Sequence, residues 1–369
     1  MIKSTRRNVL AATAVLAAAP RAFAQGPAAY WPGTGAWATQ DPKAAGFNAD
    51  KLAAAVTAAV ADNSTGVMVL RDGRIIAEAY GASGGADKLQ AIQSAGKSMT
   101  SVLTGCCLDD GKIRSLDQSA SAFFPEWKGT PKEAVTIRHL VTMTSGLDDT
   151  GLAVRNVAGD QAALNAAAPL INPPGTRWHY NTPVYHLMFH LVQRAAGEPF
   201  EAYAKKKLLD PLGMTSTTWL TNQGKDAAGK TVTNYYTANC TARDMARFGL
   251  MALGGGQWNG KTVVNPGYFR DATRPSQELN GAYGYLWWVN ARPGRAPAAN
   301  ALLRYQFAGA PLDTFAALGA GGQNVIVVPS QKLVIVRQGT QATGPGLQAQ
   351  LTAAVITSLE NPPTALARN

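Results

Sequence analysis

The stretch Gln93-Ser-Ala-Gly-Lys-Ser-Met-Thr-Ser-Val-Leu-Thr-Gly-Cys-Cys-Leu-Asp-Asp110 marks a change in the secondary structure that the sequence predicts. From Lys97 onward, apolar residues recur at helical spacing, which predicts a helix to about Asp110. Upstream, residues 66–80 form two β-branched runs around Asp72-Gly73, a pattern typical of a tight hairpin. Strands therefore precede this stretch, and helices begin at it.

A similar division extends over the whole chain. Residues 48–60 have a cap residue and apolar spacing suited to an amphipathic helix. Further helical patterns cover 136–144, 183–196, 199–209 and 241–253. Near the C-terminus, strand patterns cover 283–289, 315–318, 324–328 and 332–337, and a closing helix is expected over 346–359.

This order of elements predicts an α+β fold. The sequence indicates one antiparallel sheet assembled from both termini and flanked by helices, with a mostly helical subdomain inserted between the strands. We place the α/β part at about 45–95 and 280–369, and the helical part at about 96–279. A doubly wound parallel sheet is disfavoured because strands and helices would then alternate throughout.

The first residues predict export. Arg6 and Arg7 precede an apolar run over 9–19, and Ala22-Phe-Ala24 offers small residues at the cleavage positions. We therefore interpret residues 1–24 as a twin-arginine signal peptide, residues 25–369 as the folded domain, and the protein as periplasmic or secreted. The alternative, a structural helix with a basic start, would need a partner for an Ala-rich stretch too short to span a bilayer.

The composition excludes several classes of protein. Hydrophobic residues make up 46% of the chain and charged residues 15%, which is typical of a globular protein with a sizeable core. No stretch after residue 24 reaches the ~18 apolar residues of a membrane span. The formal charge of +11 falls to +7 without the four basic residues of 1–24. The remaining Lys and Arg are dispersed, so nucleic-acid binding is not expected.

The three cysteines are too few for a disulfide framework. Cys106 and Cys107 lie in an apolar segment, where free Cys commonly serves as a small buried hydrophobe. We favour packing for this pair over a bridge to Cys240. Two adjacent thiols without a second Cys pair or a nearby His do not make a zinc site, so the sequence predicts no metal.

Ser94 and Lys97 form a Ser-x-x-Lys pair at the start of the predicted helix. Positions i and i+3 share a helix face, so the Lys97 amine can reach the Ser94 hydroxyl. Burial disfavours the charged form of Lys, which makes a neutral amine available as a base. A serine near a helix start also has a backbone N–H beside it and a favourable field for an oxyanion.

Further segments follow the Ser-x-x-Lys pair in a fixed order. They include 98–105, 109–117, Val135-Thr-Ile-Arg-His-Leu-Val-Thr-Met-Thr-Ser-Gly-Leu147 and Pro173-Pro-Gly-Thr-Arg-Trp-His-Tyr-Asn-Thr182. Together these segments closely resemble the serine β-lactamase and penicillin-binding-protein-like superfamily. More narrowly, the chain is similar to the class C β-lactamase-related hydrolases, which include carboxylesterases and 6-aminohexanoate-dimer hydrolases. The resemblance extends from about Asp50 to the last helix.

The resemblance implies roles for three residues. Ser94 would be the nucleophile, Lys97 its general base, and Tyr180 the tyrosine of a Tyr-x-Asn motif that passes a proton to the leaving group. A phenol beside a protonated Lys can have its pKa lowered, which suits a proton shuttle. The alternative for Tyr180 is a core tyrosine beside Trp178. Thr182 stands where the family has Asn, so contact with a β-lactam side-chain amide is not expected.

The third family motif is a strand-borne Lys-Thr-Gly, and the resemblance places Gly319-Ala-Gly-Gly-Gln323 there. The Lys that binds the carboxylate of β-lactams is therefore missing. Glycines let substrate approach the strand edge, and a backbone N–H at Ala320 or Gly321 would complete the oxyanion hole with that of Ser94. We expect Thr182, Gly319, Gly321 and Trp287 to contact substrate. Other aromatic residues that could line the pocket are Trp288, Trp178, Tyr235 and Tyr236.

Two other kinds of site are disfavoured. Gly81-Ala-Ser-Gly-Gly85 matches the elbow of an α/β-hydrolase, but adjacent glycines make a poor helix start, and no His lies near the C-terminus to complete a triad. His186 and His190 could share a helix face, but Leu187 stands where a metalloprotease has Glu. We interpret both histidines as structural.

The sequence thus predicts a serine hydrolase that cleaves a small ester or linear amide through an acyl-enzyme, without metal or organic cofactor. β-Lactams rank lower as substrates because Thr182 and the Gly319 segment lack the polar groups that recognise them. The alternatives are a penicillin-binding or D-Ala peptidase-like protein, a class C β-lactamase-like protein, and a peptidoglycan-binding receptor with little turnover. The oligomeric state stays open.

Overall fold

The computed structural model describes residues 30–33, 35–290, 307–341 and 346–364. The signal peptide predicted at 1–24 lies outside the described residues. Within those four ranges, no helix is both long and apolar enough to cross a membrane.

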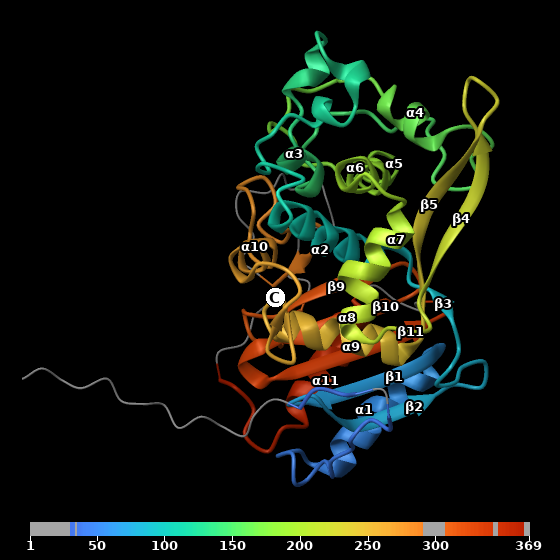
Figure 1. The fold of residues 1–369 in the computed structure, drawn as a ribbon. Coiled ribbons are helices and arrows are strands. Elements are labelled where there is room, and N and C mark those ends of the chain that lie inside the picture. The colour runs from blue at the N-terminus through green and yellow to red at the C-terminus, as the bar shows by residue number, and fades with distance from the viewer. Residues whose placement is uncertain (1–29, 34, 291–306, 342–345, 365–369) are drawn as a thin grey trace, which may run out of the picture.

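A six-stranded antiparallel sheet with strand order β2-β1-β11-β10-β9-β8 combines both ends of the chain (Figure 1). The first two strands come from the N-terminal part and the other four from the C-terminal part. Their bounds are β1 Ser64–Arg71, β2 Arg74–Tyr80, β8 Trp288–Val289, β9 Phe315–Gly319, β10 Gln323–Val328 and β11 Leu333–Gly339. The predicted α+β fold is confirmed.

The β1–β2 hairpin has the turn that its sequence predicts. Asp72 and Gly73 both have positive φ, 49° and 85°, as a two-residue turn that matches the twist of the flanking strands requires. Ahead of the hairpin, α1 (Ala49–Ala61) begins after Asn48, whose side chain accepts a hydrogen bond from the Lys51 backbone N–H.

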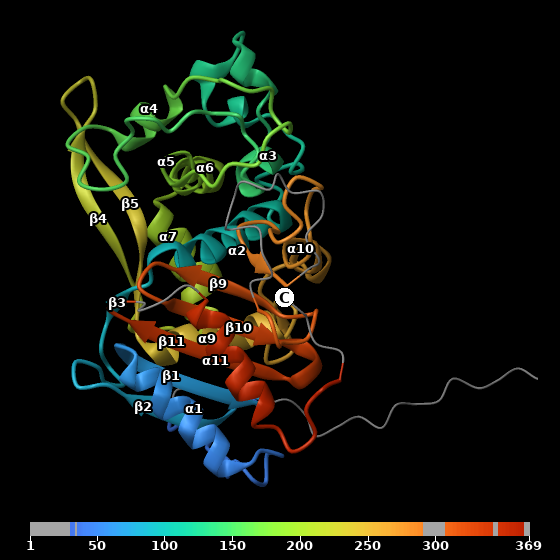
Figure 2. The same cartoon turned by 180° about the vertical axis from the view of Figure 1, so that it is seen from behind.

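The two faces of the sheet bury different helices. Helices α1 and α11 (Leu347–Thr357) cover one face, and α9 (Ala242–Leu253) packs on the other (Figures 1 and 2). Successive β11 residues alternate between the two hydrophobic cores, with Ile335 toward α1 and α11 and Val334 in the other core. On α9, a Cβ at Gly249 would lie 2.5 Å from Val334, so helix and sheet approach closely.

The helical subdomain lies at the end of the molecule remote from α1 (Figure 1). Helix α2 (Gly96–Asp109) leads into it, and all its residues from Gly96 to Cys107 are buried. The other helices are α3 Ile137–Val141, α4 Gln161–Ala166, α5 Thr182–Tyr185, α6 Leu187–Ala196, α7 Phe200–Ala204, α8 Asp210–Leu212 and α10 Pro266–Ala272, with a π-helical turn at Lys205–Leu209.

Three details of the predicted organisation were wrong. The middle of the chain also contains a long hairpin of β4 (Thr218–Lys225) and β5 (Thr231–Cys240), which pairs with β3 (Gln90–Ala91), and a short hairpin of β6 (Gln257–Trp258) and β7 (Lys261–Thr262). Helix α9 packs on the sheet although its sequence range falls in the predicted helical part. Within 283–289, only Trp288–Val289 forms a strand, because Leu286 has a φ of 60° that interrupts extended backbone.

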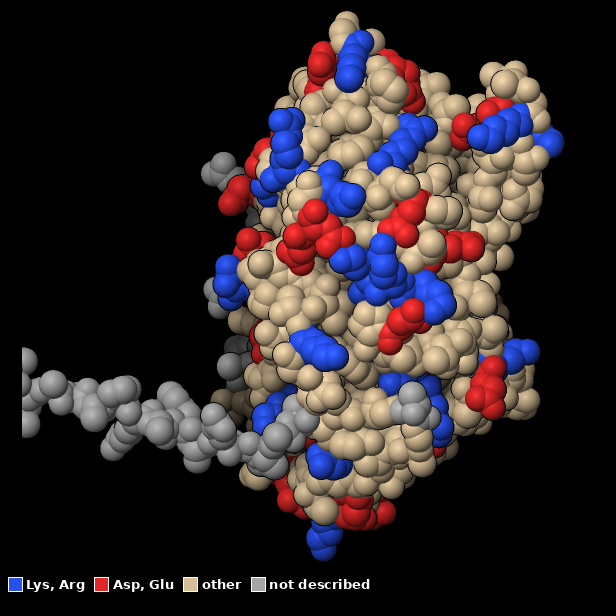
Figure 3. All heavy atoms as spheres, in the orientation of Figure 1, with Lys and Arg blue, Asp and Glu red and all other residues tan. Residues whose placement is uncertain are grey.

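Charged residues are interspersed on the surface. On the face drawn in Figure 3, Lys and Arg lie among Asp and Glu rather than in one basic patch. Some of these charges form ion pairs, including Lys205 with Asp210 and Lys207 with Asp110. All three cysteines are buried and free, which supports packing for Cys106 and Cys107.

Candidate active site

Ser94 lies in a 3-10 turn (Gln93–Ala95) directly before α2. Gln93 has a φ of 52°, an uncommon conformation for a residue with a side chain, and its carbonyl accepts a 2.6 Å hydrogen bond from Thr237 Oγ1 of β5. On the other side of the turn, a Cβ at Gly319 would lie 2.2 Å from the Ile92 carbonyl oxygen. The β5 strand and the end of β9 therefore hold the Ser94 turn between them.

Lys97 lies one helical turn after Ser94, on the same face of the turn and helix. Its Nζ is 3.1 Å from Ser94 Oγ and 3.3 Å from Thr182 Oγ1. The side chain is buried, with 3% exposure, and this loss of hydration lowers the pKa of Lys97 to about 7. A substantial fraction of Lys97 is thus neutral near pH 7 and can accept a proton.

Two aromatic rings lie next to the Lys97 amine. Its Nζ is 4.4 Å from the ring centroid of Tyr185 and 5.1 Å from that of Tyr180. Such ring faces attract an ammonium more than a neutral amine. The Tyr185 hydroxyl is 2.8 Å from Thr100 Oγ1, which fixes the buried ring against α2.

Tyr180 is close to Ser94, and its environment differs from the one the sequence predicts. A hydrogen bond with the Ser94 side chain lowers the pKa of Tyr180, but burial outweighs it and raises that pKa to about 12. The expected lowering by Lys97 is therefore wrong, because burial disfavours the charged phenolate and also favours the neutral amine. The Tyr180 ring stacks on Trp288 at 5.6 Å and meets Tyr283 edge-on at 6.1 Å.

The third predicted motif lies at the turn between β9 and β10. Ala320 lines the same cavity as Ser94, whereas Gly319 and Gly321 lie beside the cavity without lining it. The Gly321 carbonyl accepts a hydrogen bond from Arg337 at 3.0 Å. Of the two backbone positions considered for the oxyanion hole, Ala320 is thus the one that lines this cavity.

The cavity beside Ser94 has a volume of about 170 Å³. It brings together the 3-10 turn, α2, the loop before α4, the start of α5, β5 and the β9–β10 turn. Its lining residues are Gln93, Ser94, Lys97, Val154, Arg155, Thr182, His186, Tyr236, Thr237 and Ala320. Arg155 and Thr237 were not predicted from the sequence, because neither belongs to a recognisable motif.

The structure does not place Trp287 in this site. Its ring is fully buried and stacks on Phe248 at 5.5 Å, with Phe269 and Phe315 edge-on. The neighbouring Trp288 contacts Tyr180 instead. Successive residues of an extended segment point to opposite sides, so the expected substrate contact at Trp287 is wrong.

The histidines fit structural roles. His186 lines the cavity, but its Nδ1 is 3.1 Å from Gln161 Nε2, and burial lowers its pKa well below the ordinary value. Burial likewise lowers the pKa of His190 to about 4. The competing serine, Ser83, lies in an exposed turn between β2 and β3, and no helix begins there.

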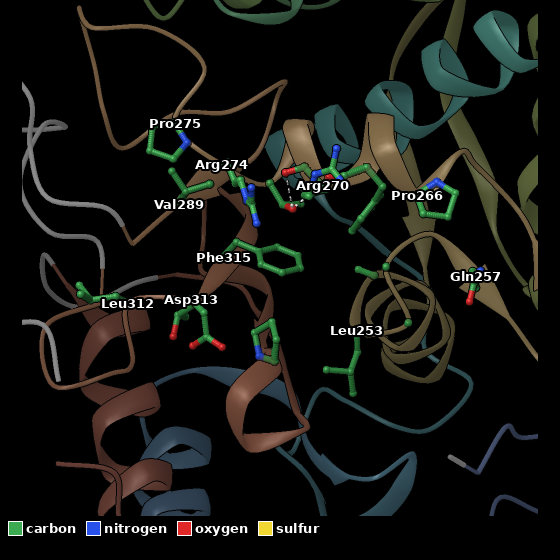
Figure 4. A pocket seen from close by; sticks show the side chains of 17 residues that line it. Leu253, Gln257, Pro266, Arg270, Arg274, Pro275, Val289, Leu312, Asp313 and Phe315 are labelled. Carbon is green, nitrogen blue, oxygen red and sulfur yellow. Dashed lines mark hydrogen bonds between the residues drawn. The ribbon is translucent and has the colours of Figure 1, made fainter. Parts of the chain in front are cut away.

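A larger cavity of about 750 Å³ lies between α9, α10 and the start of β9. Phe315 points into it from β9, and Arg270 and Arg274 lie along one side (Figure 4). Ser94, Lys97 and Tyr180 are not among its lining residues. It is therefore separate from the candidate active site.

Comparisons with known proteins agree with the resemblance in the sequence. The model of the Beta-lactamase family matches residues 50–358. The chain is 23% identical over 304 residues to the 6-aminohexanoate-dimer hydrolase of Paenarthrobacter ureafaciens, covering 73% of this chain and 71% of that protein. It is 27% identical over 164 residues to the monacolin J acid methylbutanoyltransferase of Aspergillus terreus, covering 37% of this chain and 39% of that protein.

The fold is also known from solved structures. A penicillin-binding protein homologue from Caulobacter crescentus superimposes with a TM-score of 0.64 at 18% identity, over 88% of this chain and 99% of that one. The chain matches less than two fifths of the length of the first curated relatives, so the family match carries the assignment. Since that match covers most of the sequence, this chain belongs to the beta-lactamase family.

Proposed function

We propose that this protein is a serine hydrolase that cleaves small esters or linear amides through an acyl-enzyme on Ser94. The relatives compared above are named as a hydrolase and a methylbutanoyltransferase, and both activities transfer an acyl group. The single observation that carries the proposal is the buried Lys97 amine 3.1 Å from Ser94 Oγ. A neutral amine at that distance can take the hydroxyl proton as the oxygen attacks.

The first half of the reaction forms the acyl-enzyme. Ser94 Oγ bonds to the carbonyl carbon while its proton passes to Lys97 Nζ, and the carbonyl oxygen becomes an oxyanion. The backbone N–H groups of Ser94 and Ala320 are the proposed donors to that oxyanion. Collapse of the tetrahedral intermediate breaks the bond to the leaving group, which takes a proton from the Tyr180 hydroxyl, and Tyr180 recovers it from Lys97.

The second half hydrolyses the acyl-enzyme. Water loses a proton to Lys97 through Tyr180 as its oxygen attacks the acyl carbon, and the Ser94 oxygen leaves with that proton. With its pKa raised to about 12, Tyr180 stays protonated between these steps and acts as a relay rather than as a resting phenolate. No proton is gained or lost by the enzyme over the full cycle.

Small esters and linear amides rank above β-lactams as substrates. Thr182, which stands in place of the Asn of the family motif, accepts a hydrogen bond from Lys97. Ala320 contributes no cation that could bind the carboxylate of a β-lactam. The test is a substrate panel of short-chain p-nitrophenyl esters, 6-aminohexanoate dimer, a D-amino-acid amide and a chromogenic cephalosporin. Turnover of the ester or linear amide, lost in Ser94→Ala, supports the proposal, and turnover that survives in that variant refutes it.

A penicillin-recognising receptor would behave differently in the same assay. Intact mass spectrometry after a fluorophosphonate or a penicillin reports whether Ser94 is acylated and whether the adduct decays. A stable adduct without ester turnover indicates the receptor. Rapid decay of a substrate-derived adduct indicates the hydrolase.

We also propose that residues 1–24 export the protein by the twin-arginine route, on the basis of Arg6 and Arg7 before an apolar run. The measurement is cell fractionation of the full chain and of a variant with both arginines replaced by lysine. Export of the unchanged chain and retention of the variant are expected. Equal fractionation of both proteins contradicts this route.

A further inference from the structure

The cavity beside Ser94 is lined by two cations and no acid. Among its ten lining residues are Lys97 and Arg155, and neither Asp nor Glu occurs. The Lys97 amine donates hydrogen bonds to Ser94 and Thr182, and it is partly neutral near pH 7. Guanidinium groups in proteins keep their proton. The lasting positive charge of this cavity is therefore that of Arg155.

Most hydrogen-bond donors of Arg155 have no protein partner in the described part of the chain. Its Nη2 donates to Gln93 Oε1, next to the nucleophile. None of the ion pairs among the described residues includes Arg155. A guanidinium carries five N–H groups in a planar fork that matches a carboxylate. The remaining donors can therefore bind a ligand in the cavity.

The loop that carries Arg155 is anchored close to that residue. The Val157 N–H donates to Tyr236 Oη at 3.2 Å. The Val157 carbonyl accepts hydrogen bonds from Asn222 Nδ2 at 2.8 Å and Asn234 Nδ2 at 3.1 Å. Because these bonds hold the loop to β4 and β5, little conformational freedom is lost when Arg155 binds a ligand.

The charge of Arg155 acts on His186, another lining residue of the cavity. For His186, which also lines the cavity, burial lowers the pKa most, and the charges of Lys97, His190 and Arg155 add to this lowering. The same positive charges would attract an anion in this cavity. The cavity thus favours a negatively charged group.

We propose that Arg155 binds a carboxylate at the end of the substrate's acyl part, so that the substrates are short monoesters or monoamides of dicarboxylic acids. This inference rests on the proposed function of Ser94. We place the acyl part of the substrate in this cavity, rather than the leaving group, because Ser94 and Ala320 line it. Tyr180, the proposed proton donor to the leaving group, does not line it. The volume of about 170 Å³ suits a short chain.

The test compares mono-p-nitrophenyl adipate with its methyl ester, which has the same chain without the charge. For the unchanged protein, we expect kcat/KM to favour the carboxylate about tenfold or more, mainly through KM, as a charged hydrogen bond implies. In Arg155→Gln this ratio should fall to about 1. The matched control is Arg114→Gln, which removes an equal charge from a site that is exposed, as Arg155 is, but that does not line this cavity, and it should keep the ratio.

A charge reversal makes the test more specific. Arg155→Glu should disfavour the adipate monoester and favour p-nitrophenyl 6-aminohexanoate, whose acyl chain ends in an ammonium. A merely structural role of Arg155 would lower both activities without inverting the preference. The proposal is overturned if Arg155→Glu does not invert the substrate preference and Arg155→Gln leaves the ratio of kcat/KM between the carboxylate and its methyl ester unchanged.

A binding measurement separates this inference from the proposed chemistry. Calorimetric titration with adipic acid monoamide is done on Ser94→Ala and on the double variant Ser94→Ala/Arg155→Gln. About tenfold weaker binding by the double variant supports carboxylate recognition whether or not Ser94 is the nucleophile. Equal affinity overturns the role of Arg155, even if Ser94→Ala has abolished turnover.

Discussion

Two of the cavities lined by arginine, the one beside Ser94 and the one between α9 and α10, differ in size and in chemistry. The cavity beside Ser94, about 170 Å³, contains a hydroxyl and a buried amine in hydrogen-bond contact. The cavity between α9 and α10 measures about 750 Å³, but no lysine lines it, and its arginines, Arg270 and Arg274, are exposed, as Arg155 also is. Reactivity depends on a base that has lost its hydration next to a nucleophile, and volume alone does not provide it.

The charged groups of the larger cavity confirm this difference. Asp313 accepts hydrogen bonds from the Ser330 N–H at 2.6 Å and from the Ser330 hydroxyl at 3.0 Å. Arg270 lies 3.6 Å from Asp271 in an exposed ion pair. These groups are solvated or paired, so none of them resembles the buried amine beside Ser94. Variants in the smaller cavity can therefore be compared with variants in the larger one.

Removal of the nucleophile should have the largest effect. In Ser94→Ala, we expect kcat/KM for the preferred ester to fall by about 10⁴-fold or more, because no acyl-enzyme can form. Steady-state kinetics measure the loss of turnover, and intact mass spectrometry measures the loss of the acyl adduct. Ser330→Ala, next to the larger cavity, is the matched control and should retain activity. Comparable losses in both variants would show that the smaller cavity is not the reactive one.

Replacement of the general base, Lys97, should have the next largest effect. Lys97→Arg should lower kcat/KM by about 10³-fold, because a guanidinium does not give up its proton. In the unchanged protein, the rate should rise with pH through about 7 and level off above it, since only the neutral amine accepts a proton. A pH–rate profile from 5 to 9 measures this limb. Arg274→Lys, in the larger cavity, should leave both rate and profile in place, and a fully active Lys97→Arg protein would contradict the assignment.

Loss of the proton relay should have a smaller effect. Tyr180→Phe keeps the ring between Trp288 and Tyr283 but removes the hydroxyl, so we expect about 10²-fold lower kcat with little change in the free energy of unfolding. The control is Tyr283→Phe, a neighbouring ring with no assigned proton step. Steady-state kinetics on an ester and on a more basic amide leaving group should show the greater loss for the amide. An equal loss in both tyrosine variants would indicate packing rather than proton transfer.

Local patterns in the sequence predicted much of the fold and the centre of the site. The Asp72-Gly73 turn and the spacing of Ser94 and Lys97 depend on neighbours within a few residues, so short-range rules describe them. The six-stranded sheet followed from strands at both ends of the chain. Family resemblance supplied Tyr180 and Ala320.

Features that depend on tertiary contact were not predictable in this way. Strand β4 is mostly exposed or half-buried, so it lacks the alternation that marks a strand with one buried face. Trp287 and Trp288 are adjacent in the chain, and only the backbone path set by Leu286 decides which one reaches Tyr180. Arg155 reaches the cavity from a loop 62 positions away from its partner Gln93. Nothing in its local sequence signals that approach.

The smallest predicted effect concerns the ring that faces Lys97. Tyr185→Leu removes the π face 4.4 Å from Nζ, which stabilises the ammonium but not the neutral amine, so the pKa of Lys97 should fall further. The rising limb of the pH–rate profile should move down by about one pH unit, and relative activity at low pH should increase. Tyr185→Phe keeps the ring and loses only the bond to Thr100, so its limb should stay near 7. If the rising limb moves equally in both variants, the effect comes from the hydroxyl. An upward shift in the Leu variant would contradict stabilisation of the ammonium by the ring and would leave burial as the main control of the Lys97 pKa.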